Sequence, residues 1–107
     1  PTPAAVTKAA SSETSKFNFR DRMKEINGQI KEFRRKAGRC EELLLESSRK
    51  RDRLTQDLLS TQGPSAQILA KELAECSQEI LRLEDDLLHH LENLERAEKD
   101  LRVLQES

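Results

Sequence analysis

Apolar residues recur along this chain at alternating steps of four and three residues, in two long stretches. In residues 19–58 only Ser47 and Arg51 interrupt the repeat, and in residues 66–104 it continues without a slip. A repeat of 3.5 residues keeps one side of an α-helix facing a partner helix, which is typical of a coiled coil. We therefore expect two long helices that pair along the a and d positions of a heptad lettered abcdefg. The residues of this a/d seam are Phe19, Met23, Ile26, Ile30, Phe33, Ala37, Cys40, Leu44, Leu54 and Leu58, followed by Ala66, Leu69, Leu73, Cys76, Ile80, Leu83, Leu87, His90, Leu94, Ala97, Leu101 and Leu104.

A Gly-Pro break at residues 62–65 separates the two stretches. Gly63 suits a left-handed conformation after a helix, Pro64 cannot continue a helix, and Ser65 can cap the next one. The second repeat also starts one residue late. A continuous rod would therefore need a skip residue and an internal Gly-Pro, and the Gly-Pro alone lowers helix stability by roughly 4 kcal/mol. We therefore predict an all-α fold, an antiparallel two-helix coiled-coil hairpin; a long kinked rod in a parallel dimer is the alternative. The predicted elements are helix 18–61, turn 62–65 and helix 66–107.

The register of the predicted hairpin follows from placing Leu58 opposite Leu69, so that the numbers of facing residues sum to 127. A small side chain then faces a larger one at Ile30 and Ala97, as an interface of even width requires.

The two predicted helices carry opposite charges. Residues 17–62 contain 12 Lys/Arg against 8 Asp/Glu, a net charge of +4, and residues 65–107 contain 5 against 11, a net charge of −6. Opposite charges favour pairing of the two helices within one chain.

The composition narrows the possible functions. At 107 residues the chain is at most one domain, with 35% hydrophobic and 36% charged residues, three Phe and neither Trp nor Tyr. A globular enzyme core needs more apolar and aromatic volume, whereas a helix pair leaves most positions in water. The sequence has no Gly-rich phosphate loop and no nucleophile–base pair. We therefore expect no enzymatic activity, no catalytic residue and no cofactor. No apolar run approaches the roughly 20 residues of a membrane span.

Residues 1–16 are small, polar and without periodicity, so we interpret them as a disordered tail or linker. The chain begins with Pro1, which suggests a fragment of a longer protein, although removal of an initiator Met before proline gives the same start. Two cysteines without metal-ligand spacing favour a reducing compartment. We expect a cytoplasmic protein, with the nucleus as the alternative.

Cys40 and Cys76 both occupy d positions. The predicted register separates them by about 16 Å along the axis, whereas a disulfide needs Cα atoms within about 7 Å. We expect two buried apolar thiols; disulfides between chains of an oligomer are the alternative. His90 also occupies a d position, one layer from Cys40, and its protonation would weaken helix pairing. Structural zinc requires four protein ligands, so we expect no metal site.

Arg51 places a charge in the a/d seam. One interpretation is that its aliphatic stem lies along the seam while the guanidinium pairs with Glu75 or Glu79 across it. The other is that a polar a position fixes the helix register.

Basic clusters at residues 34–39 and 49–53 raise the question of nucleic-acid binding. Acidic residues interleave with them, Glu92 lies opposite Arg35 in the predicted register, and no aromatic residues are present to stack on bases. We therefore interpret the clusters as solvated, ion-paired faces and expect no nucleic-acid partner.

A second apolar stripe in the second helix, at e and b positions beside the seam, gives the most specific functional hint. Its members are Ala70, Ala74, Leu81, Leu88 and Leu91. In the first helix, Leu45 and Leu59 lie in the same half of the predicted hairpin. A two-helix seam does not need these leucines, whereas a further helix does.

These patterns favour a coiled-coil oligomerisation or protein-docking module of a cytoplasmic scaffold, trafficking or cytoskeletal protein. The alternative is an effector hairpin that binds a small GTPase or a similar signalling protein. In either case we expect a protein partner, as a homodimer, a four-helix bundle or a complex with another helical protein. The predicted partner-binding residues are Leu45, Leu59, Leu81, Leu88 and Leu91.

Overall fold

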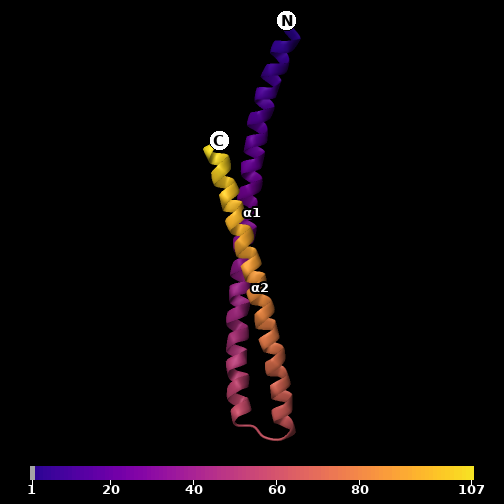
Figure 1. The fold of residues 1–107 in the computed structure, drawn as a ribbon, viewed down its shortest axis with the longest axis vertical. Coiled ribbons are helices and arrows are strands. Elements are labelled where there is room, and N and C mark those ends of the chain that lie inside the picture. The colour runs from indigo at the N-terminus through magenta and orange to yellow at the C-terminus, as the bar shows by residue number, and fades with distance from the viewer. Residues whose placement is uncertain (1) are drawn as a thin grey trace.

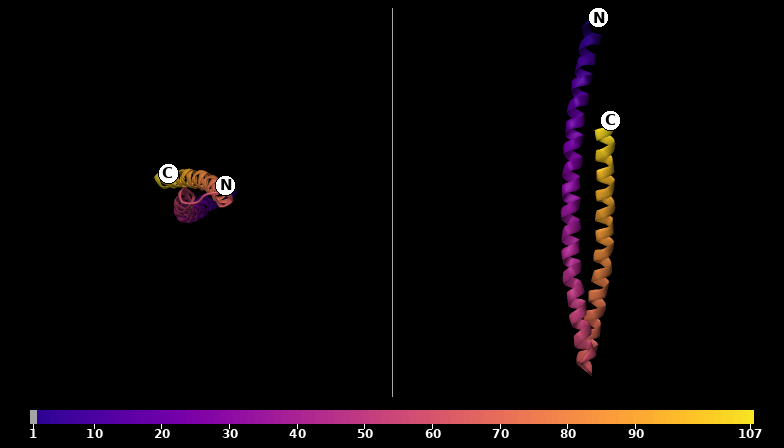
Figure 2. Two further views of the ribbon diagram at one scale, coloured as in Figure 1. Left: turned by 90° about the horizontal axis from the view of Figure 1, so that it is seen from below. Right: turned by 90° about the vertical axis from the view of Figure 1, so that its left-hand side faces the viewer.

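The computed structural model is a helical hairpin in which two helices lie side by side and run in opposite directions (Figure 1). Helix α1 spans Thr2–Leu59 and helix α2 spans Pro64–Glu106. Two further views show the same antiparallel arrangement (Figure 2). The structure describes the backbone of residues 2–107 and the side chains of residues 18–107, and the disordered tail predicted at residues 1–16 stays a prediction. The predicted antiparallel hairpin is confirmed, and the single kinked rod is wrong.

Helix α1 ends at Leu59, two residues earlier than predicted, because the hydrogen bonds that follow it are of the tighter 3₁₀ type. The N–H of Ser60 donates to the carbonyl of Asp57 at 3.3 Å, and the N–H of Thr61 donates to that of Leu58 at 3.4 Å. The Thr61 hydroxyl also donates to the Asp57 carbonyl, at 2.6 Å. These i→i+3 and side-chain bonds satisfy carbonyls that have no partner within the helix.

Helix α2 begins two residues earlier than predicted, at Pro64. Gly63 has φ 78° and ψ −153°, a positive φ as expected, but it serves as the N-cap of α2. Pro64 occupies the first helical position, where its fixed φ suits the helix and its missing N–H costs nothing. Ser65 therefore lies inside the first turn, and the prediction that it caps α2 is wrong, since no side chain makes that bond.

The core lies along the a/d seam. Every buried hydrophobic residue among residues 18–107 is at a predicted a or d position. An open-end cluster contains Ile26, Ile30 and Ala97, with Phe33, Leu94, Leu101 and Leu104 packed against them. A turn cluster contains Leu54, Cys76 and Ile80, with Leu44, Leu69 and Leu73 packed against them. Between the clusters, Ala37, Cys40 and Leu83 are also buried. In both clusters, residues of the two helices whose numbers sum to 127 lie together, as the predicted register requires; Ile30 and Ala97 are an example.

Phe19 is the exception to the predicted seam, because its side chain is 43% exposed. Phe19 lies at the open end of the hairpin, beyond the level of Leu104, which faces Met23 in the predicted register.

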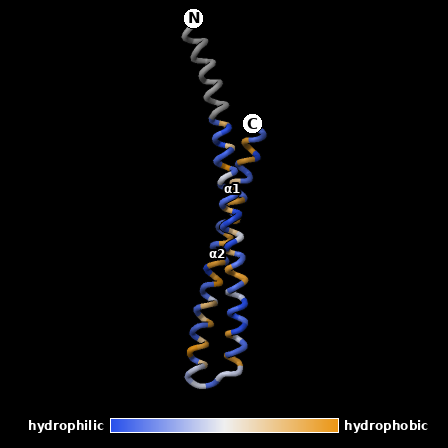
Figure 3. Tube along the Cα trace, turned by 180° about the vertical axis from the view of Figure 1, so that it is seen from behind, coloured by the Kyte–Doolittle hydropathy of each residue, from blue (hydrophilic) through white to orange (hydrophobic). Residues whose placement is uncertain are grey.

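Hydrophilic residues predominate along the coloured parts of both helices, and hydrophobic residues recur among them (Figure 3). Among the residues that the structure describes, no helical segment is both long and apolar enough to cross a membrane.

Candidate protein-docking face

Five large apolar side chains that the sequence singled out lie outside the core. Their exposed fractions are 54% for Leu45, 82% for Leu59, 65% for Leu81, 56% for Leu88 and 42% for Leu91. All are at b positions except Leu91, which is at e. Their exposure leaves them available to a partner, and their role in binding stays a prediction.

The e and b positions of the two helices lie on the same side of the hairpin. In an antiparallel pair, the e positions of both helices flank one edge of the seam and the g positions flank the other. Arg34 and Glu98, both at e, approach to 3.9 Å between Nη2 and Oε1. Arg22 and Asp100, both at g, line one groove together at the open end. We call the side that carries the e and b positions the e/b face.

The e/b face changes character along its length. Between the turn and the level of Leu91, its only charged residues are Glu41, Asp52 and Glu84. The other residues of this half are Gly38, Leu45, Ser48, Thr55 and Leu59 in α1 and Gln67, Ala70, Ala74, Ser77, Leu81, Leu88 and Leu91 in α2. Beyond Leu91 the face becomes densely charged, with Arg20, Lys24, Lys31, Arg34, Glu95, Glu98 and Arg102. The turn-proximal half is therefore the part of the face suited to packing.

The exposed leucines of the two helices also meet at matching heights. By the sum of 127, Leu81 lies level with residue 46 and thus beside Leu45, while Leu88 lies level with residue 39 and thus beside Gly38. A Cβ added to Gly38 would meet no atom within 4 Å, so the space beside it is open. The face therefore has ridges at the leucines and a gap at the glycine.

The sequence analysis missed Ile68 and Val103, which are 60% and 58% exposed. Both are at c positions, on the side opposite the e/b face. Neither residue belongs to a repeated row of apolar positions, so the heptad pattern does not predict it. Only the hydrophobicity of the residue itself could have identified it.

The two cysteines are free and buried, as expected for apolar thiols of the seam. The Cys76 thiol donates to the backbone carbonyl of Ser47, with 3.3 Å between Sγ and O. The predicted register placed Cys76 opposite Arg51, one helical turn from Ser47. Because serine is small, the thiol can reach the backbone at this gap in the apolar repeat.

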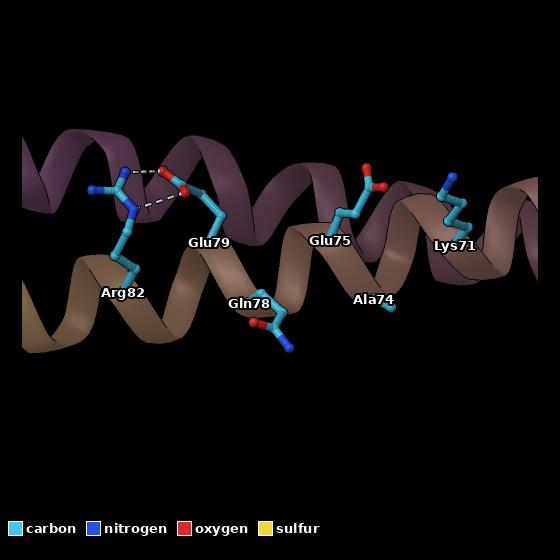
Figure 4. Close-up of a pocket in the computed structure, with 6 residues that line it drawn as sticks. All are labelled: Lys71, Ala74, Glu75, Gln78, Glu79 and Arg82. Carbon is cyan, nitrogen blue, oxygen red and sulfur yellow. Dashed lines mark hydrogen bonds and ion pairs between the residues drawn. The ribbon is translucent and has the colours of Figure 1, made fainter.

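The predicted pairing of Arg51 with Glu75 or Glu79 is wrong. Arg51 instead approaches its neighbour Asp52, at 3.7 Å between Nε and Oδ1. Glu79 accepts a hydrogen bond from Nε of Arg82 at 3.0 Å, on the outer surface of α2 (Figure 4). This hydrogen bond lowers the pKa of Glu79 below its ordinary value. The shallow hollow around this pair is lined by α2 alone and forms no cleft between the helices.

The basic clusters are partly neutralised within α1 itself. Arg35 pairs with Glu32 at 2.6 Å, and the bond lowers the pKa of the Glu32 carboxyl. Arg39 pairs with Glu42 at 3.3 Å. The partner expected for Arg35, Glu92, makes no such contact, because both residues are at f positions, on the sides of the two helices that face away from each other. Exposed pairs of this kind contribute little to stability.

No group of three or more potential metal ligands occurs among residues 18–107. His90 is half-buried in the seam and His89 is exposed. Comparison of the chain with protein-family models, with curated proteins and with solved structures gave no significant match.

Proposed function

We propose that this chain is a coiled-coil oligomerisation or docking module that binds a helical partner through the turn-proximal half of its e/b face. The observation that carries the proposal is the convergence of Leu45, Leu59, Leu81, Leu88 and Leu91 on one side of the hairpin, all exposed. Exposed leucines scattered singly are ordinary. Leucines from two helices gathered in the least charged part of one face favour an interaction site.

The energy available from this face is sufficient for a specific interaction. Burying one leucine side chain contributes about 1.5–3 kcal/mol. Two leucines therefore contribute at least about 3 kcal/mol, which corresponds to more than a hundredfold in affinity. The flanking alanines and serines would let a partner helix approach closely without the loss of charged groups from water.

We further propose a role in a scaffold, trafficking or cytoskeletal protein of the cytoplasm, without enzymatic activity. Two buried thiols that remain unbridged fit a reducing compartment. The hairpin measures 20 × 14 Å across, a thin body better suited to lateral contacts than to enclosing a substrate.

The proposal is tested by replacing Leu81 and Leu88 together with glutamine. Both side chains are exposed, so the variant should keep the helicity of the wild type in circular dichroism. Its mass by light scattering after size exclusion, or its affinity for an identified partner, should fall. The matched control replaces Ile68 and Val103, which are equally apolar and exposed but lie on the opposite side.

A Leu81/Leu88 variant that keeps both wild-type mass and partner affinity would contradict the proposed interaction face. A wild type that is monomeric at micromolar concentration, yet binds another protein through Leu81 and Leu88, would favour the effector-hairpin alternative.

A further inference from the structure

We infer that the partner of the e/b face is a second copy of this chain, packed antiparallel about a two-fold axis at Leu81 to form a four-helix bundle. This inference rests on the proposed function and specifies its partner. In such a dimer α2 packs against α2 of the second copy and α1 against α1, with the two turns at opposite ends of the shared interface.

When α2 lies antiparallel to α2 of the second copy, with the two Leu81 side chains level, large side chains of one helix face small side chains of the other. Leu88 lies seven residues after Leu81 and Ala74 seven before it, so each Leu88 faces Ala74 of the second copy. Leu91 and Ala70 lie ten and eleven residues from Leu81 and face each other in the same way. Both alanines are exposed, as a site that receives a leucine must be. Large against small along a reversed copy is the pattern of a self-complementary two-fold interface.

Helix α1 fits the same axis. The level of Leu81 corresponds to residue 46 of α1, so the two copies of Leu45 meet beside the axis. Gly38 then lies opposite the segment 52–55 of the second copy, and its missing side chain leaves room for that helix. Leu59 lies opposite the aliphatic stems of Lys31 and Arg34, which can cover apolar surface while their charges stay in water.

In the other two-fold arrangement the hairpins align turn to turn, and α1 packs against α2 of the second copy. Alignment would place Glu41 against Glu84 and Lys24 against Arg102, which are like charges, and Lys31 against Glu95, which are opposite charges. In the antiparallel dimer Glu84 faces Ser77, while Glu41 lies one residue from the level of Asp52, so this packing also brings one pair of like charges together. The charged open ends then project beyond the interface.

The contact area is adequate for a stable dimer. The overlap runs from the turn of one copy to about residue 31 of the other, roughly 30 residues or about 45 Å of helix. Across a hairpin 20 Å wide this gives a footprint of about 900 Å² per chain. Standard protein interfaces bury about 800 Å² per partner.

The test uses the full chain, a short bis-maleimide cross-linker and denaturing electrophoresis. Leu81→Cys should give a covalent dimer as the main product, because the two copies meet at the axis. Leu88→Cys should give no more dimer than the wild type, since its two copies lie about 21 Å apart along the axis. Adding Ala74→Cys to Leu88→Cys should restore cross-linking. The wild type, whose own thiols are buried, is the baseline, and circular dichroism checks that each variant is helical.

Two results would overturn the inference. A wild type that is dimeric by mass while Leu81→Cys cross-links no more than the wild type would indicate aligned hairpins, and the proposed function would stand. A monomeric wild type at micromolar concentration would exclude a second copy as the partner. Failure of the Leu81/Leu88 glutamine variant to alter mass or binding is the separate result that would count against the proposed function itself.

Discussion

Replacing Leu83 with aspartate should unfold the hairpin, and the size of the effect follows from where this side chain lies. Leu83 is 3% exposed at a d position between the two core clusters. The substitution forfeits about 1.5–3 kcal/mol of apolar burial. It also places a carboxylate without a partner in the core, at about 3–5 kcal/mol. The expected loss is therefore about 5–8 kcal/mol.

This loss is comparable with the entire stability of the fold. Domains are stable by about 0.05–0.15 kcal/mol per residue, or roughly 5–13 kcal/mol for about 90 residues. Glu84, the next residue, is exposed, so Glu84→Ala should change stability by no more than about 0.5 kcal/mol. Leu83→Ala should fall between them, at about 2–5 kcal/mol, and separates the effect of lost volume from that of buried charge.

The assay is thermal and urea unfolding followed by circular dichroism at 222 nm, with all variants at one chain concentration because oligomerisation shifts the midpoint. Leu83→Asp should show little helix at room temperature or a sharply lowered midpoint, while Glu84→Ala should match the wild type. Equal midpoints for Leu83→Asp and Glu84→Ala would refute the assignment of Leu83 to the core and, with it, the register.

Two further predictions concern the hairpin itself. Spin labels at Met23 and Leu104, measured in a large excess of unlabelled chain, should show a short distance, because packed helices lie about 8–10 Å apart; a separation approaching a helix length, about 60 Å, would be incompatible with the fold. Gly63→Ala should destabilise the hairpin by about 1–3 kcal/mol, because φ 78° with ψ −153° is a conformation that alanine avoids, whereas Gly28→Ala, in an open helical position, should stabilise it by about 1 kcal/mol. Equal unfolding midpoints for these two glycine variants would show that the turn does not require glycine.

The hairpin and its core could be predicted from the sequence because both depend on periodicity. Ile26, Ile30, Cys76 and Ile80 are buried where the heptads place them. The limits of the helices were less predictable, since Pro64 can either end one helix or begin the next and only the backbone conformation of Gly63 decides between them. Phe19 was expected in the seam but is exposed, because a heptad position alone does not say how much of a side chain the neighbouring helix covers.

Ion pairs were also poorly predicted from sequence. Arg35 and Arg51 each find an acceptor on their own helix, where several carboxylates lie within reach and the free-energy differences among them are small. The exposed leucines were identified correctly as lying outside the seam, because b and e positions follow from the same repeat. The heptad repeat alone does not show what covers them, and a second copy is inferred from the order of side-chain sizes along α2.

The division of the core into two clusters has a consequence for the order in which the chain assembles. Leu54 and Leu73, in the turn cluster, close a loop of about 19 residues, whereas Ile30 and Ala97, in the open-end cluster, close one of about 67. The longer closure costs about 1 kcal/mol more in chain entropy when it forms alone. The two helices should therefore pair first next to the turn and then progressively toward the open end. Each pair of facing residues that forms shortens the loop that the next pair must close. Leu59 and Leu81 lie nearer the turn than the open end, so the turn-proximal half of the e/b face can form while the charged ends of the helices are still apart.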